Sequence, residues 1–581
     1  RDVAAARGHL DHLADLLAHD PLVGLARAFP PTAADVRGAD ALVVAARDLF
    51  AAADDGLAMG RRFVEIKEAQ AADPKNASAL AQLVELMATS RDRALAAQAA
   101  LSAARETLAT VPNGLAGPIE STRDAMIGRI ETYGPLLDGY VTASARLPAM
   151  LGWDGPRRYL VLTQNPAELR PTGGYIGSYG IIAFDRGRVT ERQFRDIFLL
   201  DLPWDYPFVT PPQELADYLL GPTQPWQLAD ANWSPDFPTS AKDAIRLYTN
   251  ESGDADIDGV LGITTYTIDE LLKVTGPVSV PDYEATIASG ETTLKVLQLT
   301  RVAQRPDENR KAFLSAFADR LLATLVALPP AKWGAILGEG ETFQTQRLLL
   351  AWFRDPSDQA LVTEGGFDGA VRQDPGDYVY PVDSNVAPTS KLNVLTTRSL
   401  QLDVQLDGVG NARNTLAVTW ENRILAPEGT PYRELPTLED RRILGMYFRL
   451  LAPERSRVEA VSGGSFIKLS APGVVEEEAG RTVIGTYLKV PPGRTSLRYD
   501  WVSPYAANAD ETGGLYRLTI QCQPGLLPGP LTLTIRVPAG FRITAASEGL
   551  TVAGRTATLR TTFDRDMVLG VRYAPEASAA P

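Results

Sequence analysis

The fold of the central part of this chain is decided by residues 158–190, which read RYLVLTQNPAELRPTGGYIGSYGIIAFDRGRVT. The apolar run at residues 158–162 is typical of a buried strand, and a polar loop follows it at residues 165–174. Residues 175–184 predict a second strand, and Asp185 to Arg188 read as the hairpin turn after it. The stretch therefore predicts a strand, a polar loop and a second strand at the start of a folded domain.

Strands and helices alternate after this stretch. The patterns predict a third strand at residues 189–200, a helix at 239–249, a strand at 258–263, a helix at 266–274 and a longer helix at 310–328. Such alternation is typical of an α/β domain. We assign residues 151–391 to it.

The region before this domain has a helical pattern. Residues 1–150 are rich in Ala and Leu, and Pro30-Pro31, Pro74 and Pro112 should end or kink helices there. A stripe with a period of seven residues consists of Leu80, Met87, Ala94, Leu101 and Leu108. Its companion positions are polar, which favours three or four helices in a bundle over a coiled-coil dimer.

The region after the domain has a β pattern. Short strand-like runs separated by turns fill residues 392–581, which predicts one or two immunoglobulin-like β-sandwiches. Alternation in the run TLAVTW should bury Leu416, Val418 and Trp420 on one face. The expected fold class is therefore multidomain α+β, with a helical bundle, an α/β domain and a sandwich region.

Composition excludes several kinds of function. The 581 residues exceed one hydrophobic core, and the net charge of −14 argues against a general nucleic-acid binder. The only cysteine is Cys522, so the chain can form no internal disulfide and no thiolate zinc site. All three histidines fall in the first twenty residues, at His9, His12 and His19. Histidine-based nucleophilic catalysis in the later domains would therefore need a base from the N-terminal helix.

No apolar run reaches the roughly 18–20 residues that span a bilayer. The chain begins at Arg1 rather than methionine, which leaves open whether a leader or an anchor precedes it.

Three charged clusters are candidate sites for an anion. In the polar loop, Arg170 stands before Gly173 and Gly174, whose backbone could approach an anion, although the same residues suit a plain turn. A second cluster is Arg195-Asp196, and a third consists of Arg301, Arg305, Asp307 and Arg310. Arginine binds phosphate through two hydrogen bonds, and aspartate can hold Mg²⁺ against it. Solvated salt bridges are the alternative interpretation.

A further candidate is the run DANWSPDFP at residues 230–238, which contains Asn232. Aromatic and Asx residues among prolines could form a rigid wall for a ligand. A packed loop that leads into a helix is the alternative.

Three runs carry a resemblance to a known family. Residues 165–190, the run DANWSPDFPTSAKDAIRLY at 230–248 and the run DGVLGITTYTIDELLKVTGPV at 258–278 resemble the bacterial family labelled domain of unknown function 4012. The resemblance covers about residues 155–400, and the label gives no activity.

The same core is more distantly similar to the LytR-CpsA-Psr family, which transfers polyprenyl-pyrophosphate-linked glycans to the cell wall. This resemblance implies that pyrophosphate is bound by Arg170, Arg195, Arg301, Arg305 and Arg310. It implies Mg²⁺ as the cofactor, held by Asp196 or Asp307. Apart from the resemblance, the polar loop and the run at residues 230–238 give Asn165, Gly173, Gly174 and Asn232 as candidate ligand contacts. Thr172 stands where that family has a metal-binding aspartate, so the resemblance leaves catalysis open.

The resulting hypothesis is an extracytoplasmic cell-envelope protein, at the cell surface or anchored in the membrane. Its central domain would bind, or also transfer, a phosphorylated polyprenyl-linked glycan. The expected partners are the lipid-linked phosphoglycan or a cell-wall polymer and a membrane surface, without nucleic acid. The alternative is a non-catalytic structural or adhesive component of a surface assembly or homo-oligomer.

Overall fold

The computed structural model describes residues 2–72, 79–202, 204–302, 312–326, 328, 332, 338–387, 391–425, 432, 442–464 and 474–576. The chain forms two compact units over these residues. The helical unit comprises Arg1–Arg157 and Ala183–Thr190, and the large unit comprises Arg158–Ile182 and Glu191–Pro581.

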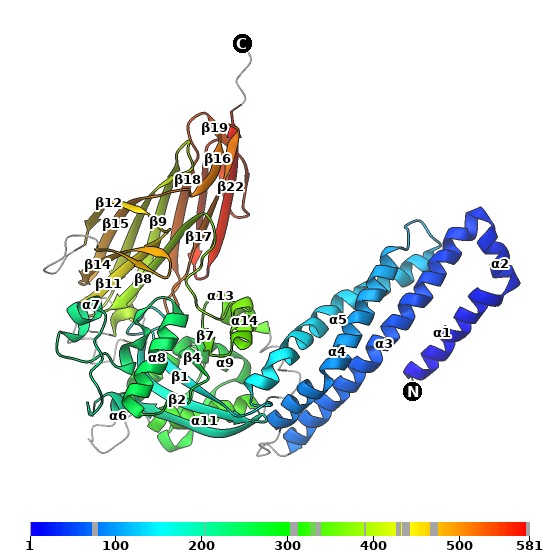
Figure 1. Ribbon diagram of the computed structural model, residues 1–581, viewed down its shortest axis with the longest axis horizontal. Helices are drawn as coiled ribbons and strands as arrows, with labels where there is room; N and C mark the ends of the chain where they lie inside the picture. The colour runs from blue at the N-terminus through cyan, green and yellow to red at the C-terminus, as the bar shows by residue number, and fades with distance from the viewer. Residues whose placement is uncertain are drawn as a thin grey trace, which may run out of the picture. The chain divides into compact units, whose positions relative to one another are not determined.

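The helical unit is built from long helices (Figure 1), which are α1 (Asp2–His19), α2 (Pro21–Ala28), α3 (Pro30–Ala72), α4 (Ala79–Ala109) and α5 (Gly117–Met150). Helix α3 begins at Pro30, and Pro112 lies between α4 and α5, because proline fits at a helix start and disrupts a helix interior. A hydrophobic cluster joins α3, α4 and α5 through Leu42, Leu108 and Ile130. The predicted N-terminal helices are confirmed, while Pro74 lies outside the described residues.

The α/β part of the large unit is organised around one sheet, here called the core sheet. Its strands follow the order β3-β2-β1-β4-β7 over the described residues. They are β1 (Arg157–Asn165), β2 (Tyr175–Asp185), β3 (Arg188–Asp196), β4 (Gly259–Thr264) and β7 (Leu349–Phe353). β1 pairs with β4 in parallel, and β4 pairs with β7 in antiparallel. The predicted central α/β domain is thus confirmed.

The predicted third strand was too long. Strand β3 ends at Asp196, and the short helix α6 (Phe198–Asp201) follows it. The Oδ1 atom of Asp196 accepts a hydrogen bond from the amide of Phe198 at 3.1 Å, which turns the chain out of the strand.

Helices cover both faces of the core sheet. Helix α8 (Phe237–Ser252) packs on one face, where Ala241, Ala244 and Leu247 are fully buried. Helices α9 (Thr265–Thr275), α10 (Thr292–Val302) and α11 (Ala312–Val326) belong to the other face. The shorter elements are α7 (Gln213–Leu215), η1 (Ala216–Leu220), η2 (Leu228–Trp233), β5 (Val278–Val280), η3 (Pro281–Tyr283), β6 (Ala285–Ile287), α13 (Gly340–Thr345) and α14 (Pro356–Glu364).

The C-terminal part is rich in sheet, as predicted. Over the described residues, sheet I has the order β12-β15-β10-β9-β18-β21-β20, and sheet II has the order β13-β14-β11-β8-β17-β22-β19, with β16 paired to β17. One hydrophobic cluster gathers side chains from both sheets, and Trp420 of sheet I meets Phe448 of sheet II at 5.3 Å between ring centroids. Leu416, Val418 and Trp420 are buried, which confirms the predicted alternation. The immunoglobulin-like form stays a prediction.

The strands of these sheets are β8 (Asp377–Asn385), β9 (Thr396–Leu406), β10 (Ala412–Asn422), β11 (Leu444–Ala452), β12 (Arg457–Gly463), β13 (Val474–Glu478), β14 (Arg481–Val490), β15 (Gly493–Ser503), β16 (Ala507–Asp510), β17 (Gly513–Ile520), β18 (Gly529–Arg536), β19 (Phe541–Ala546), β20 (Thr551–Ala553), β21 (Thr556–Phe563) and β22 (Met567–Pro575). Helix η4 (Leu392–Leu395) precedes β9. Strand β8 belongs to sheet II, so the sheet region begins at Asp377, before the expected boundary at residue 392.

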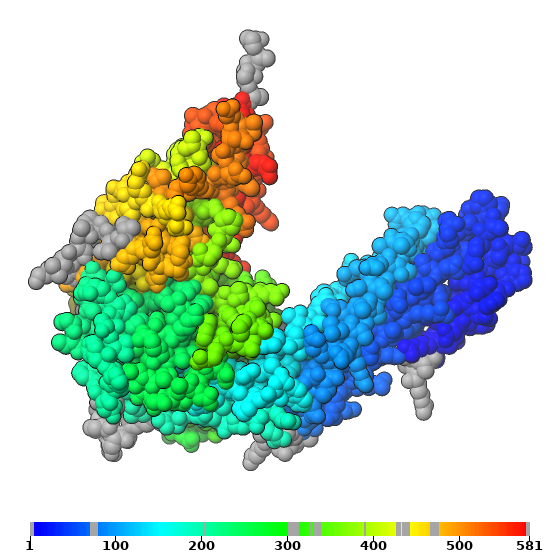
Figure 2. Space-filling model, viewed as in Figure 1, coloured from blue at the N-terminus to red at the C-terminus, as the bar shows by residue number. Residues whose placement is uncertain are grey.

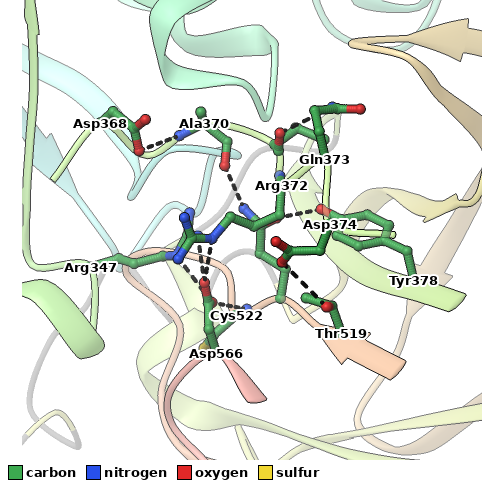
Figure 3. A network of polar contacts seen from close by, with 12 residues as sticks. Arg347, Asp368, Ala370, Arg372, Gln373, Asp374, Tyr378, Thr519, Cys522 and Asp566 are labelled. Atoms are coloured by element: carbon green, nitrogen blue, oxygen red, sulfur yellow. Dashed lines mark hydrogen bonds and ion pairs between the residues drawn. The ribbon is translucent and has the colours of Figure 1, made fainter. Parts of the chain in front are cut away.

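A buried polar network joins the α/β part to the sheets (Figure 3). Arg347, just before β7, binds both carboxylate oxygens of Asp566, at 3.1 Å and 2.6 Å. Asp566 also accepts the amide of Cys522 at 2.8 Å. The α/β part and the sheets therefore form one compact unit, and their surfaces run into each other without a gap in Figure 2. Among the described helices, none is both long and apolar enough to span a bilayer.

Candidate functional site: an apolar cavity bordered by arginines

A cavity of about 300 Å³ lies between the core sheet and helices α9, α10 and α11. Its largest wall is one face of α11, which supplies Leu314, Phe317, Ala318, Leu321, Leu322 and Leu325. Counted from Leu314, these positions recur at i+3, i+4, i+7, i+8 and i+11, so they form one stripe of the helix. Ile182 of β2, Ile263 of β4 and Leu271 of α9 extend the apolar lining. The volume is at the lower end of the range for small-molecule sites.

One edge of the cavity is polar because two parallel strands end there. In the β1–β4 pair, Gln164 lies opposite Thr264, and both residues line the cavity with Asn165. From β1 the chain continues to β2 on one side, whereas β4 lies on the other side. The strand order therefore reverses between β1 and β4, so this point is a topological switch point of the sheet. Open α/β sheets bind ligands at such points, beyond the carboxyl ends of their strands.

Two buried polar groups on the cavity wall lack partners. The Oε1 atom of Gln164 accepts hydrogen bonds from Thr172 and from Asn232, both at 2.7 Å. The Nε2 atom of Gln164 and the Oγ atom of Ser178 have no hydrogen-bond partner within the described chain. A buried donor without a partner costs about 1–3 kcal/mol. The Nε2 atom of Gln164 faces Gly262 and Phe237, on the α8 side of the sheet, so the Ser178 hydroxyl is the one of the two that a polar atom of a ligand could satisfy.

Three basic side chains also line the cavity. The Nε atom of Arg192 pairs with Asp319 at 2.8 Å, and the Nζ atom of Lys391 pairs with Glu168 at 3.2 Å. Arg195 is exposed and hydrogen-bonds to Tyr179, and it makes no ion pair with another described residue. Arg195 is therefore the basic group of the cavity that is best placed to receive an anion.

Arg170 lies elsewhere, in the core. The residue is 1% exposed, and its Nε and Nη2 atoms donate to Oδ1 of Asp230 at 3.2 Å and 3.1 Å. Its Nη1 atom donates to the carbonyl of Asn385 at 2.9 Å. Burial raises the pKa of Asp230, although the charge of Arg170 opposes the rise. Arg170 is not among the described residues that line the cavity, so the structure does not bring Arg170 and Arg195 together there.

The other residues expected to bind the ligand also fall into two groups, those that line the cavity and those that are buried. Asn165 lines the cavity, whereas Gly173, Gly174 and Asn232 are buried beside it. Gly174 has φ +148°, and a Cβ atom there would lie 2.2 Å from the carbonyl oxygen of Asn165. Asn232 donates to the carbonyl of Gly174 at 2.8 Å. These contacts give the glycines a role in closing the loop tightly.

The expected Mg²⁺ site has no support among the described residues. Asp196 is buried and accepts the amide of Phe198, and Thr172 donates its hydroxyl to Gln164. The described part of the chain contains no cluster of three or more His, Cys, Asp and Glu side chains that could hold a metal ion. Arg305, Asp307 and Arg310 lie outside the described residues, and only the backbone of Arg301 is described, in α10.

The sequence interpretation missed Arg192, Gln164, Lys391 and the α11 stripe. The apolar period of α11 was a usable signal for a helix wall. Gln164 stands at the end of an apolar run, and Lys391 lies far along the chain from the strands of the core sheet that line the cavity. Neither residue therefore had a local sequence pattern that marked it as part of the site.

Two comparisons with known proteins give matches. Residues 154–300 match the family model described as "Protein of unknown function (DUF4012)", which confirms the expected resemblance over that segment. No curated protein matches the chain.

Several solved structures are similar to part of this chain. B. subtilis TagV is 14% identical, with 36% of this chain and 79% of that chain covered and a TM-score of 0.22. Protein gbs0355 from Streptococcus agalactiae is 13% identical, with 37% and 74% covered and a TM-score of 0.23. An M1 zinc metallopeptidase E323A mutant from Deinococcus radiodurans is 18% identical, with 31% and 42% covered and a TM-score of 0.17. TM-scores of this size carry no argument about function.

Proposed function

We propose that the central domain of this protein binds an amphiphile outside the cytoplasmic membrane, namely a phosphorylated polyprenyl-linked glycan. The hydrocarbon chain would occupy the cavity, and the phosphorylated head group would lie at the edge that carries Arg195. The protein would thereby bind a precursor of cell-envelope glycopolymers.

The observation that carries this proposal is the composition of the cavity wall. The α11 stripe and the facing side chains of β2, β4 and α9 are apolar, and such a wall favours a hydrocarbon chain over a sugar or a nucleotide. Polar and basic groups occur among the lining residues too, and they include Gln164, Arg195 and Lys391. A ligand with one long apolar part and one anionic part matches both features.

The proposal is limited to binding. The resemblance assigns Arg170 to pyrophosphate and the position of Thr172 to a metal ligand. In the structure, Arg170 pairs with Asp230 and Thr172 bonds to Gln164. Both groups hold other protein groups, so the described contacts support a binding site for the ligand and supply no step of a transfer reaction.

The test is to fill the cavity with a larger side chain. Ala318 lines the cavity from α11, and Ala318→Phe should weaken binding of a detergent-solubilised polyprenyl phosphate by at least about tenfold, because the ring takes the space of the chain. Ala323→Phe is the matched control, since Ala323 is exposed on the same helix. Displacement of a fluorescent polyisoprenoid probe measures both affinities.

Equal affinity in the two variants would overturn the assignment of the cavity. No binding by the unmodified protein would overturn the proposed function and would favour the structural role in a surface assembly.

A further inference from the structure

We propose that the exposed apolar side chains of residues 198–202 and 204–208 insert into the interfacial region of a lipid bilayer. The segment, here called the apolar loop, reads FLLDLPWDYPF and begins directly after β3. Its outward side chains are large and apolar, and their exposed fractions are 36% for Phe198, 61% for Leu199, 62% for Leu202, 53% for Trp204 and 57% for Phe208. Helix α6 marks the position of the loop in Figure 1.

The size of this patch separates it from ordinary exposed residues. With an area of about 150–250 Å² for each aromatic side chain and a similar or smaller area for each leucine, the five exposed fractions amount to roughly 500 Å² of surface. The largest apolar patch of a typical monomer is about 300–600 Å² and is often functional. A stable protein interface needs about 800 Å² from each partner. The area of the patch is therefore within the range of patches that are often functional, but it is small for a dimer interface with a second copy of the chain.

The loop is held outward by its own anchors. Ile197 and Leu200 are buried in the core of the α/β part, and Val209 packs against the same cluster. The carbonyl of Asp201 accepts hydrogen bonds from the Tyr206 hydroxyl at 2.5 Å and from Gln227 at 2.6 Å. These contacts fix the backbone while the large side chains between them point away, as an inserting segment requires.

Trp204 has φ +50°, in the left-handed region that residues with a side chain rarely adopt. A strained backbone that presents an exposed tryptophan is typical of functional segments. Tryptophan also concentrates at membrane interfaces, where its ring is apolar and its N–H can reach water.

The charges of the segment favour a neutral surface. Between Asp196 and Ala241 the chain has no lysine or arginine, and the loop itself carries Asp201 and Asp205. Attraction to anionic lipid headgroups therefore cannot hold the loop, and insertion of apolar side chains can. The loop begins three residues after Arg195, which lines the cavity. A bilayer at the loop would bring hydrocarbon close to this edge of the core sheet.

The inference does not rest on the proposed ligand, because the test uses vesicles of pure phosphatidylcholine without polyprenyl phosphate. The full chain should sediment with these vesicles, and the binding should be insensitive to salt. The double variant Trp204→Ser with Phe208→Ser should bind about tenfold more weakly, since each lost ring removes a large part of the inserted area. The matched control is Val409→Ser with Tyr505→Ser, whose side chains are 73% and 83% exposed in the sheet region.

A site-specific label locates the insertion. With the buried Cys522 replaced by alanine, an environment-sensitive dye on Leu199→Cys should shift to the blue on vesicles, and the same dye on Val409→Cys should not. Loss of binding in both double variants, binding only to anionic vesicles, or a loop variant that changes the oligomeric state without lipid would overturn the inference.

Discussion

Two neighbouring segments of the α/β part reverse the usual relation between polarity and burial. The loop at residues 165–174 is polar in sequence, yet most of it is buried, and the apolar loop at residues 198–208 exposes most of its large side chains. Burial of the first is stable because its buried polar side chains have protein partners, as Arg170 has in Asp230 and Thr172 has in Gln164. Nothing in the described part of the chain covers the exposed apolar side chains of the second loop. The comparison teaches that polar residues can build a core and that exposed apolar residues imply an external partner.

The largest expected effect on stability comes from removing the buried arginine of the first loop. Arg170→Met leaves the carboxylate of Asp230 buried without its cation, and such a loss costs about 3–5 kcal/mol. The free energy of unfolding of the large unit should fall by this amount in denaturant titrations followed by tryptophan fluorescence. Arg195→Met is the matched control, because Arg195 is exposed, and its effect should stay within about 0.5 kcal/mol. Similar losses in both variants would contradict the contrast between the two arginines.

Thr172→Asp tests whether the buried loop retains a metal site. Thr172 is 1% exposed and donates its hydroxyl to Oε1 of Gln164. A carboxylate there has no proton to donate and faces that oxygen, so stability should fall by about 2–3 kcal/mol. Thr172→Val, which removes only the hydrogen bond, should cost less, about 1 kcal/mol. Recovery of Thr172→Asp stability on addition of Mg²⁺ would instead show that the loop can bind the metal.

The sequence was informative wherever a local period set the structure. The alternation at residues 415–420 predicted which side chains of β10 are buried, and the apolar spacing at 310–328 predicted the helix that became α11. The predicted helix at 266–274 corresponds to α9. Periodicity reports which face of an element is apolar, and these elements obey it.

The candidate site was harder to predict because its contacts are distant in sequence. Arg170 bonds to Asp230 and Asn385, which are 60 and 215 positions away, and no local pattern distinguishes this core arginine from a phosphate-binding one. The loop glycines have the same ambiguity, because a tight turn and an anion site use the same backbone. The start of the apolar loop was misassigned, because residues 198–200 were included in the predicted third strand although FLLDLPWDYPF shows neither a strand period nor a helix period.

A buried pair of carboxyl groups beneath the apolar loop should make stability depend on pH. Burial and their mutual interaction raise the pKa of Asp201 to about 10, and burial raises the pKa of Glu251 to about 7. The folded state therefore retains protons that the unfolded state releases, so stability is present at low pH and is lost as pH rises through these values. The loss between pH 6 and pH 9 should be about 1 kcal/mol for each pH unit.

Asp201→Asn should flatten this dependence, because an amide can donate to Glu251 without losing a proton. Asp205→Asn, in the exposed part of the same loop, should leave the dependence unchanged. Thermal unfolding at several pH values measures all three proteins. An equally steep dependence in Asp201→Asn would show that other groups control it.

Arg195→Met, which should change stability least, gives the sharpest test of the exposed arginine at the cavity. Arg195 has no ion pair among the described residues, so its loss should leave folding intact and act only on the ligand. A charged hydrogen bond contributes about 1.5–3 kcal/mol when shielded, and the exposure of Arg195 reduces this, so affinity for polyprenyl phosphate should fall by about tenfold. Affinity for the uncharged polyprenol should not change, since the cavity still holds the chain. Equal loss for both ligands would mean that Arg195 shapes the cavity wall and does not bind the phosphate, whereas no loss for either would place the head group away from this edge of the core sheet.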